Sequence, residues 1–211
     1  MFTELAEAGF VVERIGELRR SDYRAALPIL LRWLPRVKER DLKWAIVSAL
    51  GTRWAKPVAA PALIAEFRQA PDDADGYKWA IGYALSDVID DGVFEDLVPL
   101  VCDHRHGHAR QKIVRAFGTL RDPRAVAVLI ELLSDADAEI VEQALIALGQ
   151  LRATRARARI VSLLTHEDRW VRRAAQRALA RIDQTVERAS RMPAGMGRGA
   201  RGVRNEDGRC T

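Results

Sequence analysis

The segment DLKWAIVSALG (residues 41–51) is nearly repeated as GYKWAIGYALS (residues 76–86), with six of eleven positions identical. Three further copies, ARQKIVRAFG, IVEQALIALG and VRRAAQRALA, end at residues 118, 149 and 180. In each copy a large apolar residue, here called the marker, stands just before the end, and successive markers are 35, 32, 31 and 31 residues apart. The markers are Leu50, Leu85, Phe117, Leu148 and Leu179. A period of this length is typical of repeat proteins.

The copies have the apolar pattern of a helix. Apolar residues lie four and eight positions before each marker, and an alanine lies one position before it. This spacing places them on one face of an α-helix. Each copy follows another apolar segment of helical length, and these segments are ALPILLRWL, APALIAEF, FEDLVPLVC, AVAVLIELL and ARARIVSLL. Because one helix pair cannot bury its own apolar face, we expect an all-α stack of about five pairs that share a continuous core.

The period also predicts the domain boundaries. We expect a single repeat domain over residues 1–183, which begins with a capping helix over residues 2–20. Residues 184–211 include RMPAGMGRGARGVRNEDGRCT, whose Gly and Arg content is typical of a disordered tail. The five repeats are expected at residues 22–56, 57–91, 92–122, 123–153 and 154–183.

One family resemblance follows from these residues. The run LRDPRAVAVLIELLSDADAEIVEQALIALGQL (residues 120–151) resembles the short bacterial HEAT repeat of the phycobilisome-lyase type, and the similarity extends over roughly residues 22–182. The resemblance implies a right-handed α-solenoid in which the second helices of the pairs line a concave groove. It implies little about chemistry, because such repeats occur in scaffolds, lyases, hydroxylases and glycosylases.

The chain lacks the residue patterns of three enzyme classes that are built from HEAT-like repeats. HEAT-type deoxyhypusine hydroxylases hold a di-iron centre with several His-Glu pairs, whereas this chain has one, His166-Glu167. HEAT-like alkylpurine DNA glycosylases use a groove Asp, but the expected groove positions hold a single acid, Glu142. No motif indicates the tetrapyrrole pocket of a bilin lyase. We therefore expect a non-catalytic protein without a cofactor, and an enzyme of the lyase or glycosylase type remains the third hypothesis.

Composition indicates an ordinary soluble chain. Its 211 residues are 48% hydrophobic and 30% charged, and the N-terminus has neither the charge nor the apolar run of a signal peptide. No segment has the apolar length of a membrane span. The two cysteines, Cys102 and Cys210, give no disulfide framework and favour the cytoplasm.

Charge is distributed unevenly along the chain. Residues 1–151 have a net charge of −4, residues 152–183 of +6 and residues 184–211 of +3. A basic C-terminal end favours an acidic partner or nucleic acid there. A protein partner is the leading hypothesis, and nucleic acid bound by the basic fifth repeat and the tail is the second.

The candidate binding site lies on the second helices, at positions counted back from the markers. Lys43, Lys78, Arg110 and Arg172 stand seven positions before a marker; Trp44, Trp79 and Arg173 stand six before; Tyr83, Arg115 and Arg177 stand two before. Cations interleaved with aromatic rings can bind carboxylates, phosphates or bases. We expect a partner's acidic or aromatic segment to dock on the first two repeats. The predicted site residues are Lys43, Trp44, Lys78, Trp79, Tyr83, Arg110, Arg172 and Arg173.

Two structural interpretations compete with this site. The cations of the second helices could pair with acids of the neighbouring repeat, and both tryptophans could pack between repeats. The histidine cluster in DHRHGHAR, with His104, His106 and His108, can likewise be a solvated turn or a zinc or nickel site. The solvated turn is favoured, because no second cluster supplies a fourth ligand.

Overall fold

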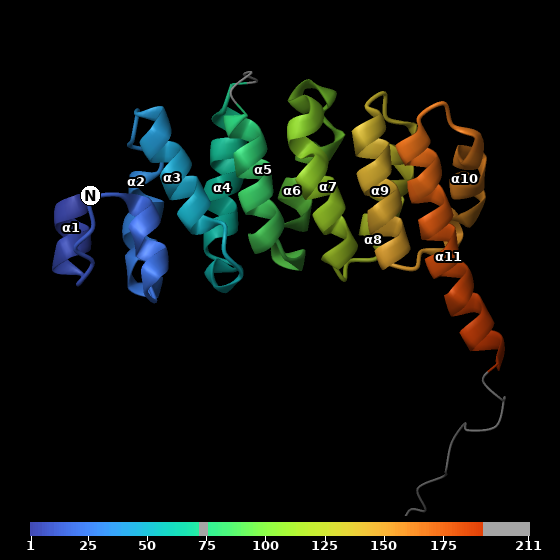
Figure 1. Cartoon of the computed structure of the whole chain (residues 1–211), viewed down its shortest axis with the longest axis horizontal. Coiled ribbons are helices and arrows are strands. Elements are labelled where there is room, and N and C mark those ends of the chain that lie inside the picture. The colour runs from blue at the N-terminus through green and yellow to red at the C-terminus, as the bar shows by residue number, and fades with distance from the viewer. Residues whose placement is uncertain (72–75, 192–211) are drawn as a thin grey trace, which may run out of the picture.

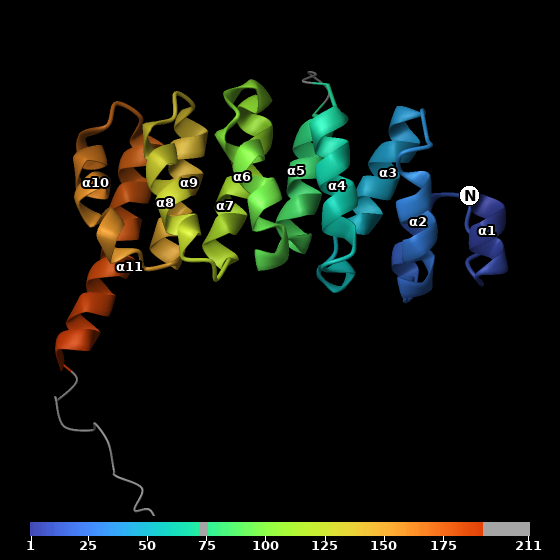
Figure 2. The same cartoon turned by 180° about the vertical axis from the view of Figure 1, so that it is seen from behind.

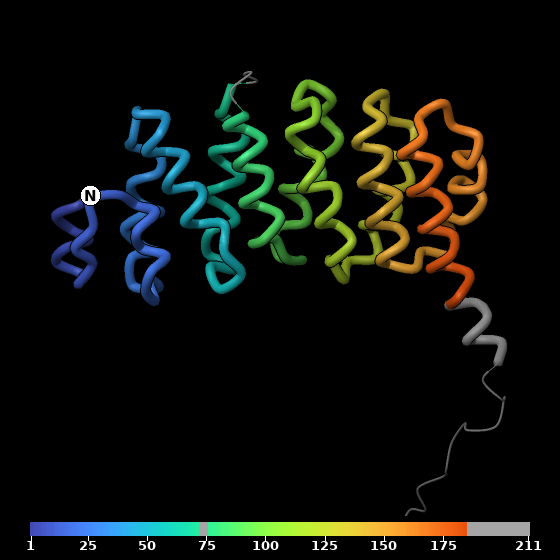
Figure 3. The backbone as a smooth tube through the Cα atoms, viewed as in Figure 1, coloured from blue at the N-terminus to red at the C-terminus, as the bar shows by residue number. Residues whose placement is uncertain are grey.

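The protein is an all-α solenoid, and its described residues form five stacked helix pairs (Figure 1). The computed structural model describes residues 1–71 and 76–191, and no strand occurs within them. First helices form one layer and second helices form the other, as the view from behind shows (Figure 2). The chain advances from one end of the stack to the other without turning back, so each pair lies beside its neighbours in sequence (Figure 3).

The helices of the pairs begin and end close to the predicted positions. Short 3₁₀ turns, such as η5 (His104–Arg110), extend or connect several of them. The first helices are α2 (Leu27–Trp33), α4 (Ala59–Gln69), α6 (Phe94–Cys102), α8 (Arg124–Glu131) and α10 (Arg157–Ser162). The second helices are α3 (Arg40–Leu50), α5 (Tyr77–Val88), α7 (Gln111–Ala116), α9 (Ala138–Gln150) and α11 (Arg169–Arg191).

The core follows the markers. Leu50, Leu85, Phe117 and Leu148 are fully buried, whereas Leu179 in the last pair is partly covered. Glycines that follow three of the markers allow consecutive second helices to come into close contact. A Cβ added at Gly51 would lie 2.8 Å from Cα of Ala84. A Cβ added at Gly118 would lie 2.9 Å from Cα of Ala147, and one at Gly149 would lie 3.0 Å from Cα of Ala178. The first helices pack less closely on each other. The second helices therefore form the inner layer.

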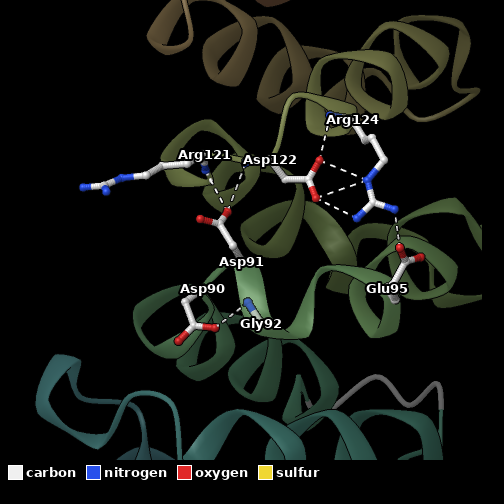
Figure 4. Close-up of polar contacts among 7 residues, drawn as sticks. All are labelled: Asp90, Asp91, Gly92, Glu95, Arg121, Asp122 and Arg124. Atoms are coloured by element: carbon white, nitrogen blue, oxygen red, sulfur yellow. Dashed lines mark hydrogen bonds and ion pairs between the residues drawn. The ribbon is translucent and has the colours of Figure 1, made fainter.

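Polar contacts join successive repeats at their turns, as in the junction before α8 (Figure 4). The backbone N–H groups of Arg121 and Asp122 donate to Oδ1 of Asp91, over 2.8 and 3.2 Å. The Arg124 guanidinium pairs with both Asp122 and Glu95. Hydrogen bonds from the side chain and backbone of Arg124 lower the pKa of Asp122. The carboxylates of Asp91, Asp122 and Glu95 and the Arg124 guanidinium are thus used within the protein, whereas the Arg121 side chain points away from these acids (Figure 4).

The two ends differ from the sequence prediction. Residues 2–20 form two short helices, α1 (Phe2–Glu7) and η1 (Ile15–Arg20), so the single capping helix was wrong. Gly9 has a φ of +91°, a left-handed conformation that breaks the helix. At the other end α11 continues to Arg191, and residues 184–191 are helical because the sequence has no Gly or Pro between Arg169 and Pro193. Residues 192–211 of the predicted disordered tail lie outside the described residues.

Within the described ranges, no helix has the length and apolar character needed to cross a membrane.

Candidate binding groove on the second helices

The predicted cations seven positions before the markers contact other helices or turns of the protein. Arg110 is 1% exposed, and its Nη1 lies 2.8 Å from Oδ2 of Asp135 in the turn between α8 and α9. Its guanidinium also donates to the carbonyls of Val101 and Gly107, over 2.9 and 3.0 Å. Arg110 therefore connects the third and fourth repeats.

Lys43, Lys78 and Arg172 also make contacts within the protein. Lys43 Nζ donates over 2.6 Å to Oε1 of the buried Glu66, which accepts a second bond from the Tyr77 hydroxyl. Lys78 is 5% exposed and lies 5.3 Å from the centre of the Phe67 ring. Arg172 donates to the carbonyls of His166 and Glu167. These side chains hold the helices and turns beneath the inner surface.

Both tryptophans of the repeated segment are partly buried against the core. The Trp44 ring packs 6.0 Å from that of Tyr77. The Trp79 ring lies 5.7 Å from Tyr83, whose side chain is half exposed. Lys112 Nζ is 5.4 Å from the Trp79 ring centre and 5.9 Å from that of Tyr83. The second and third repeats therefore share an aromatic and cationic cluster, of which the sequence prediction lacked Lys112.

Shallow depressions run along the inner layer from α5 to α11. The first, of about 350 Å³, is lined by Tyr83, Lys112 and Arg115 among others. The second, of about 320 Å³, is lined by Arg115, Glu142 and Arg177 among others. A third, of about 240 Å³, lies between Glu142 and Trp170. Since Arg115 and Glu142 each line two of them, the depressions form one track, here called the groove and defined by Tyr83, Lys112, Arg115, Glu142, Trp170 and Arg177.

Trp170 is a groove residue that the sequence prediction missed. It is 46% exposed at the start of α11, and the guanidinium carbons of Arg169 and Arg173 lie 4.6 and 5.6 Å from its ring centre. A backbone N–H of this turn donates to Asp168, and hydrogen bonds from Val171 and Trp170 lower the pKa of that carboxyl. Trp170 is nine positions before the marker, two helical turns before Arg177. The predicted groove positions stopped at seven residues before the marker, and including the preceding helical turn would have identified Trp170 from the sequence.

Another depression, of about 670 Å³, lies at the N-terminal end of the inner layer, between η1 and α3. It is lined by apolar residues such as Ile15 and Leu42 and by acids such as Glu17 and Asp41. Hydrogen bonds from the backbone N–H groups of Glu13 and Arg14 lower the pKa of Glu17. The inner layer is thus lined by more acids than cations near its N-terminal end, by more cations than acids in the two depressions that share Arg115, and by acids again beside Trp170.

The histidine cluster does not converge on one point. The His104 side chain is 71% exposed and lies 3.3 Å from Asp135, whereas the His106 side chain is mostly covered and packs against the Phe67 ring. Within residues 1–71 and 76–191, no three His, Cys, Asp or Glu side chains are grouped to hold a metal ion.

Comparisons with known proteins agree on the fold. Two solved structures of designed armadillo repeat proteins are similar to this chain. One, in complex with the peptide (KR)4, has a TM-score of 0.56 and 14% sequence identity, and the match covers 86% of this chain and 91% of the other. The second has a TM-score of 0.54 and 14% sequence identity, and the match covers 83% of this chain and 90% of the other. The structure of an engineered protein has a TM-score of 0.53 and 21% sequence identity, and the match covers 86% of this chain and 90% of the other. No curated protein matches the chain.

The sequence itself identifies the family. The family model for HEAT repeats matches residues 60–148 and 129–192, which together are more than half of the chain. This protein therefore belongs to the HEAT repeat family.

Proposed function

We propose that this protein is a non-catalytic binding module whose groove holds an extended segment of a protein partner. The observation that supports this most directly is the connected track of depressions on the second helices, with the exposed rings of Tyr83 and Trp170 at its two ends. Aromatic and arginine side chains are enriched at protein interfaces and often dominate their binding energy. Within the HEAT repeats, we assign the chain to the short bacterial phycobilisome-lyase-type class, acting in the cytoplasm.

The shape of the groove favours a macromolecule over a small substrate. Small-molecule sites are usually deep cavities that enclose most of the ligand, whereas these depressions are shallow and follow several helices. The residues that line them include no cysteine or histidine that could serve as a nucleophile or a general base. The shallow, extended shape therefore supports binding of a macromolecular segment.

The predicted site residues contribute to this function in two ways. Tyr83 lines the groove, and Trp79 and Arg173 adjoin it through their contacts with Tyr83, Lys112 and Trp170, so we propose that these three contact the partner. Trp44 on α3 packs against Tyr77, and we propose that it extends the same surface beyond the end of the groove. Lys43, Lys78, Arg110 and Arg172 support that surface from beneath, because their charged groups contact other parts of the protein. The designed armadillo protein bound to (KR)4 provides a structural precedent for peptide binding by a similar solenoid.

The test is a comparison of two exposed side chains on opposite layers. Tyr83→Ala should weaken binding of the partner at least tenfold, or by about 1.4 kcal/mol, because it removes an aromatic anchor. Val161→Ala on α10 is the control, since Val161 is similarly exposed but lies on the outer layer. The partner is captured from native cytoplasm with and without nuclease, identified, and titrated against each variant. Equal affinity of both variants would place the interface elsewhere.

Nucleic acid is the second candidate, supported by Trp170 and its flanking arginines on α11. Single-stranded nucleic acid is commonly bound by rings and cations combined in this way. Three carboxylates, those of Glu139, Glu142 and Asp168, line the same depression as Trp170 and would repel the uniformly charged phosphates of a nucleic acid that stacked on this ring. This favours a protein segment, whose charge can vary from one residue to the next. A salt titration separates the two, because phosphate binding weakens steeply and linearly on a logarithmic scale with salt concentration.

A further inference from the structure

We propose that the partner segment is acidic, with carboxylates that bind Lys112 and Arg115 on α7 and Arg177 on α11. This inference rests on the proposed function and specifies the chemistry of the segment that the groove holds.

The charges of the two depressions that share Arg115 support an acidic segment there, whereas the third depression, beside Trp170, is lined by carboxylates and no cation. The two depressions that share Arg115 are lined by four cations, Lys112, Arg115, Arg177 and Arg181, and by two carboxylates, Asp87 and Glu142. Two surface arginines of this protein form ion pairs across repeats, Arg124 with Glu95 and Arg68 with Asp96. In the part of the chain that the structure describes, neither Arg115 nor Arg177 forms an ion pair. Their guanidinium groups are therefore available to bind carboxylates in a bidentate manner.

The lysine beside the aromatic cluster disfavours a basic partner segment. Aromatic rings such as the half-exposed Tyr83 and the partly buried Trp79 could attract a cationic side chain of a partner. Here the ammonium group of Lys112 already lies near both rings, at 5.4 and 5.9 Å from their centres. A partner lysine or arginine would meet this charge, whereas an Asp or Glu would pair with it. A neighbouring apolar side chain of the partner can then rest on the half-exposed ring of Tyr83.

The next repeat defines an approximate order along the segment. On α9 the depression is lined by Ile146, which is partly exposed, and by Glu142. An apolar partner residue fits at Ile146, and a second acid is disfavoured beside Glu142. Arg177 on α11 follows as the next cation. The groove thus favours an acid over α7, an apolar residue over α9 and an acid near α11.

The experiment selects ligands from a library of random dodecapeptides with the full-length protein. We expect the selected peptides to be rich in Asp and Glu and to carry at least one large apolar or aromatic residue. Dissociation constants of the best peptides are then measured for three variants. Arg115→Glu should weaken binding at least tenfold, Glu142→Gln should strengthen it severalfold, and Arg121→Glu should change it less than twofold.

Arg121 is the matched control because its side chain is exposed and points away from the acids of its junction (Figure 4). Circular dichroism verifies that each variant is folded, and Arg177→Glu replaces Arg115→Glu if the latter unfolds. A selection of basic or neutral peptides would overturn the acidic segment but leave the groove as a peptide site. Acidic peptides that bind Arg115→Glu as tightly as the original protein would overturn it as well. Recovery of no peptide, with tight binding of the oligonucleotide (dT)12, would overturn the proposed function itself.

Discussion

At the scale of single residues, Arg110 and Asp135 form a buried ion pair that links two repeats. Both side chains are almost fully covered, and the pair adds hydrogen bonds to the carbonyls of Val101 and Gly107. Placing two charges in a low-dielectric interior costs free energy that their mutual attraction only partly offsets. The pair therefore contributes more to the alignment of α6, α7 and the α8–α9 turn than to net stability. Removing one partner alone should be far more harmful than removing both.

Asp135→Ala is predicted to lower the free energy of unfolding by about 3 to 5 kcal/mol, because it leaves the Arg110 guanidinium buried without its counter-ion. The double variant Arg110→Met with Asp135→Ala should recover at least half of that loss. Urea denaturation followed by circular dichroism measures both values. A loss for Asp135→Ala below about 1 kcal/mol, the range of exposed pairs, would show that the pair is hydrated in solution.

At the scale of elements, glycine-to-alanine contacts set the spacing of the second helices. Gly51, Gly118 and Gly149 each lie directly against an alanine of the next second helix. Close approach here, together with wider spacing of the first helices, makes the second helices the inner layer. Between α5 and α7, the remaining pair of consecutive second helices, Ser86 stands at the position of these glycines. A serine is therefore tolerated at this junction. The curvature of the groove thus depends on a few small residues.

Gly51→Ala tests this contact with Gly16→Ala as its control. Replacing Gly by Ala commonly stabilises a protein by about 0.4 to 1 kcal/mol where the conformation allows it. A Cβ at Gly16 would have no heavy atom within 4 Å, so we expect a neutral or stabilising effect there. At Gly51 the new Cβ would lie 2.8 Å from both Cα and Cβ of Ala84. This overpacking should destabilise by about 1 to 3 kcal/mol, and an equal rise in melting temperature for both variants would contradict the close contact.

Most helix pairs were predictable because their apolar positions recur relative to the markers. Leu148 and Ala147 belong to a pattern that needs no knowledge of distant residues. The N-terminal cap was mispredicted because Gly9 interrupts a segment that otherwise has helical composition. A single glycine in the left-handed conformation ends the helix there, although its neighbours have a high helix propensity.

The candidate site was less predictable, since exposure depends on how each helix is rotated against its neighbours. Positions six and seven before a marker are about 100° apart around a helix, and this difference buries Arg110 but leaves Arg173 exposed. The acid that pairs with Arg110 is 25 residues away in another turn, and no periodicity indicates it. Lys112 belongs to the site because its ammonium group lies beside the rings of Trp79 and Tyr83 in the preceding repeat. Sequence periodicity does not indicate this contact between two helix pairs either. Sequence periodicity therefore identifies the inner helices better than the side chains that face the groove.

At the scale of the whole molecule, each repeat contacts chiefly its neighbours (Figure 3). Stability in such a stack is approximately a sum of repeat stabilities and interface terms, so damage to one interface should spread little beyond adjacent pairs. A partner that spans α5 to α11 would couple these pairs, because it contacts several of them at once. The free protein should instead open locally, which a substitution at one marker can reveal.

Leu148→Ala is the clearest such substitution, because Leu148 is fully buried in α9 between the fourth and fifth repeats. The cavity should lower the free energy of unfolding of this region by about 2 to 5 kcal/mol. Amide hydrogen exchange should then show lost protection in α9 and the first half of α11, while α3 and α5 keep most of theirs. Leu50→Ala in α3 should give the reverse distribution. An equal loss of protection from α3 to α11 in both variants would mean that the stack unfolds as one cooperative unit, and unchanged protection of α9 would mean that Leu148 is not a core residue.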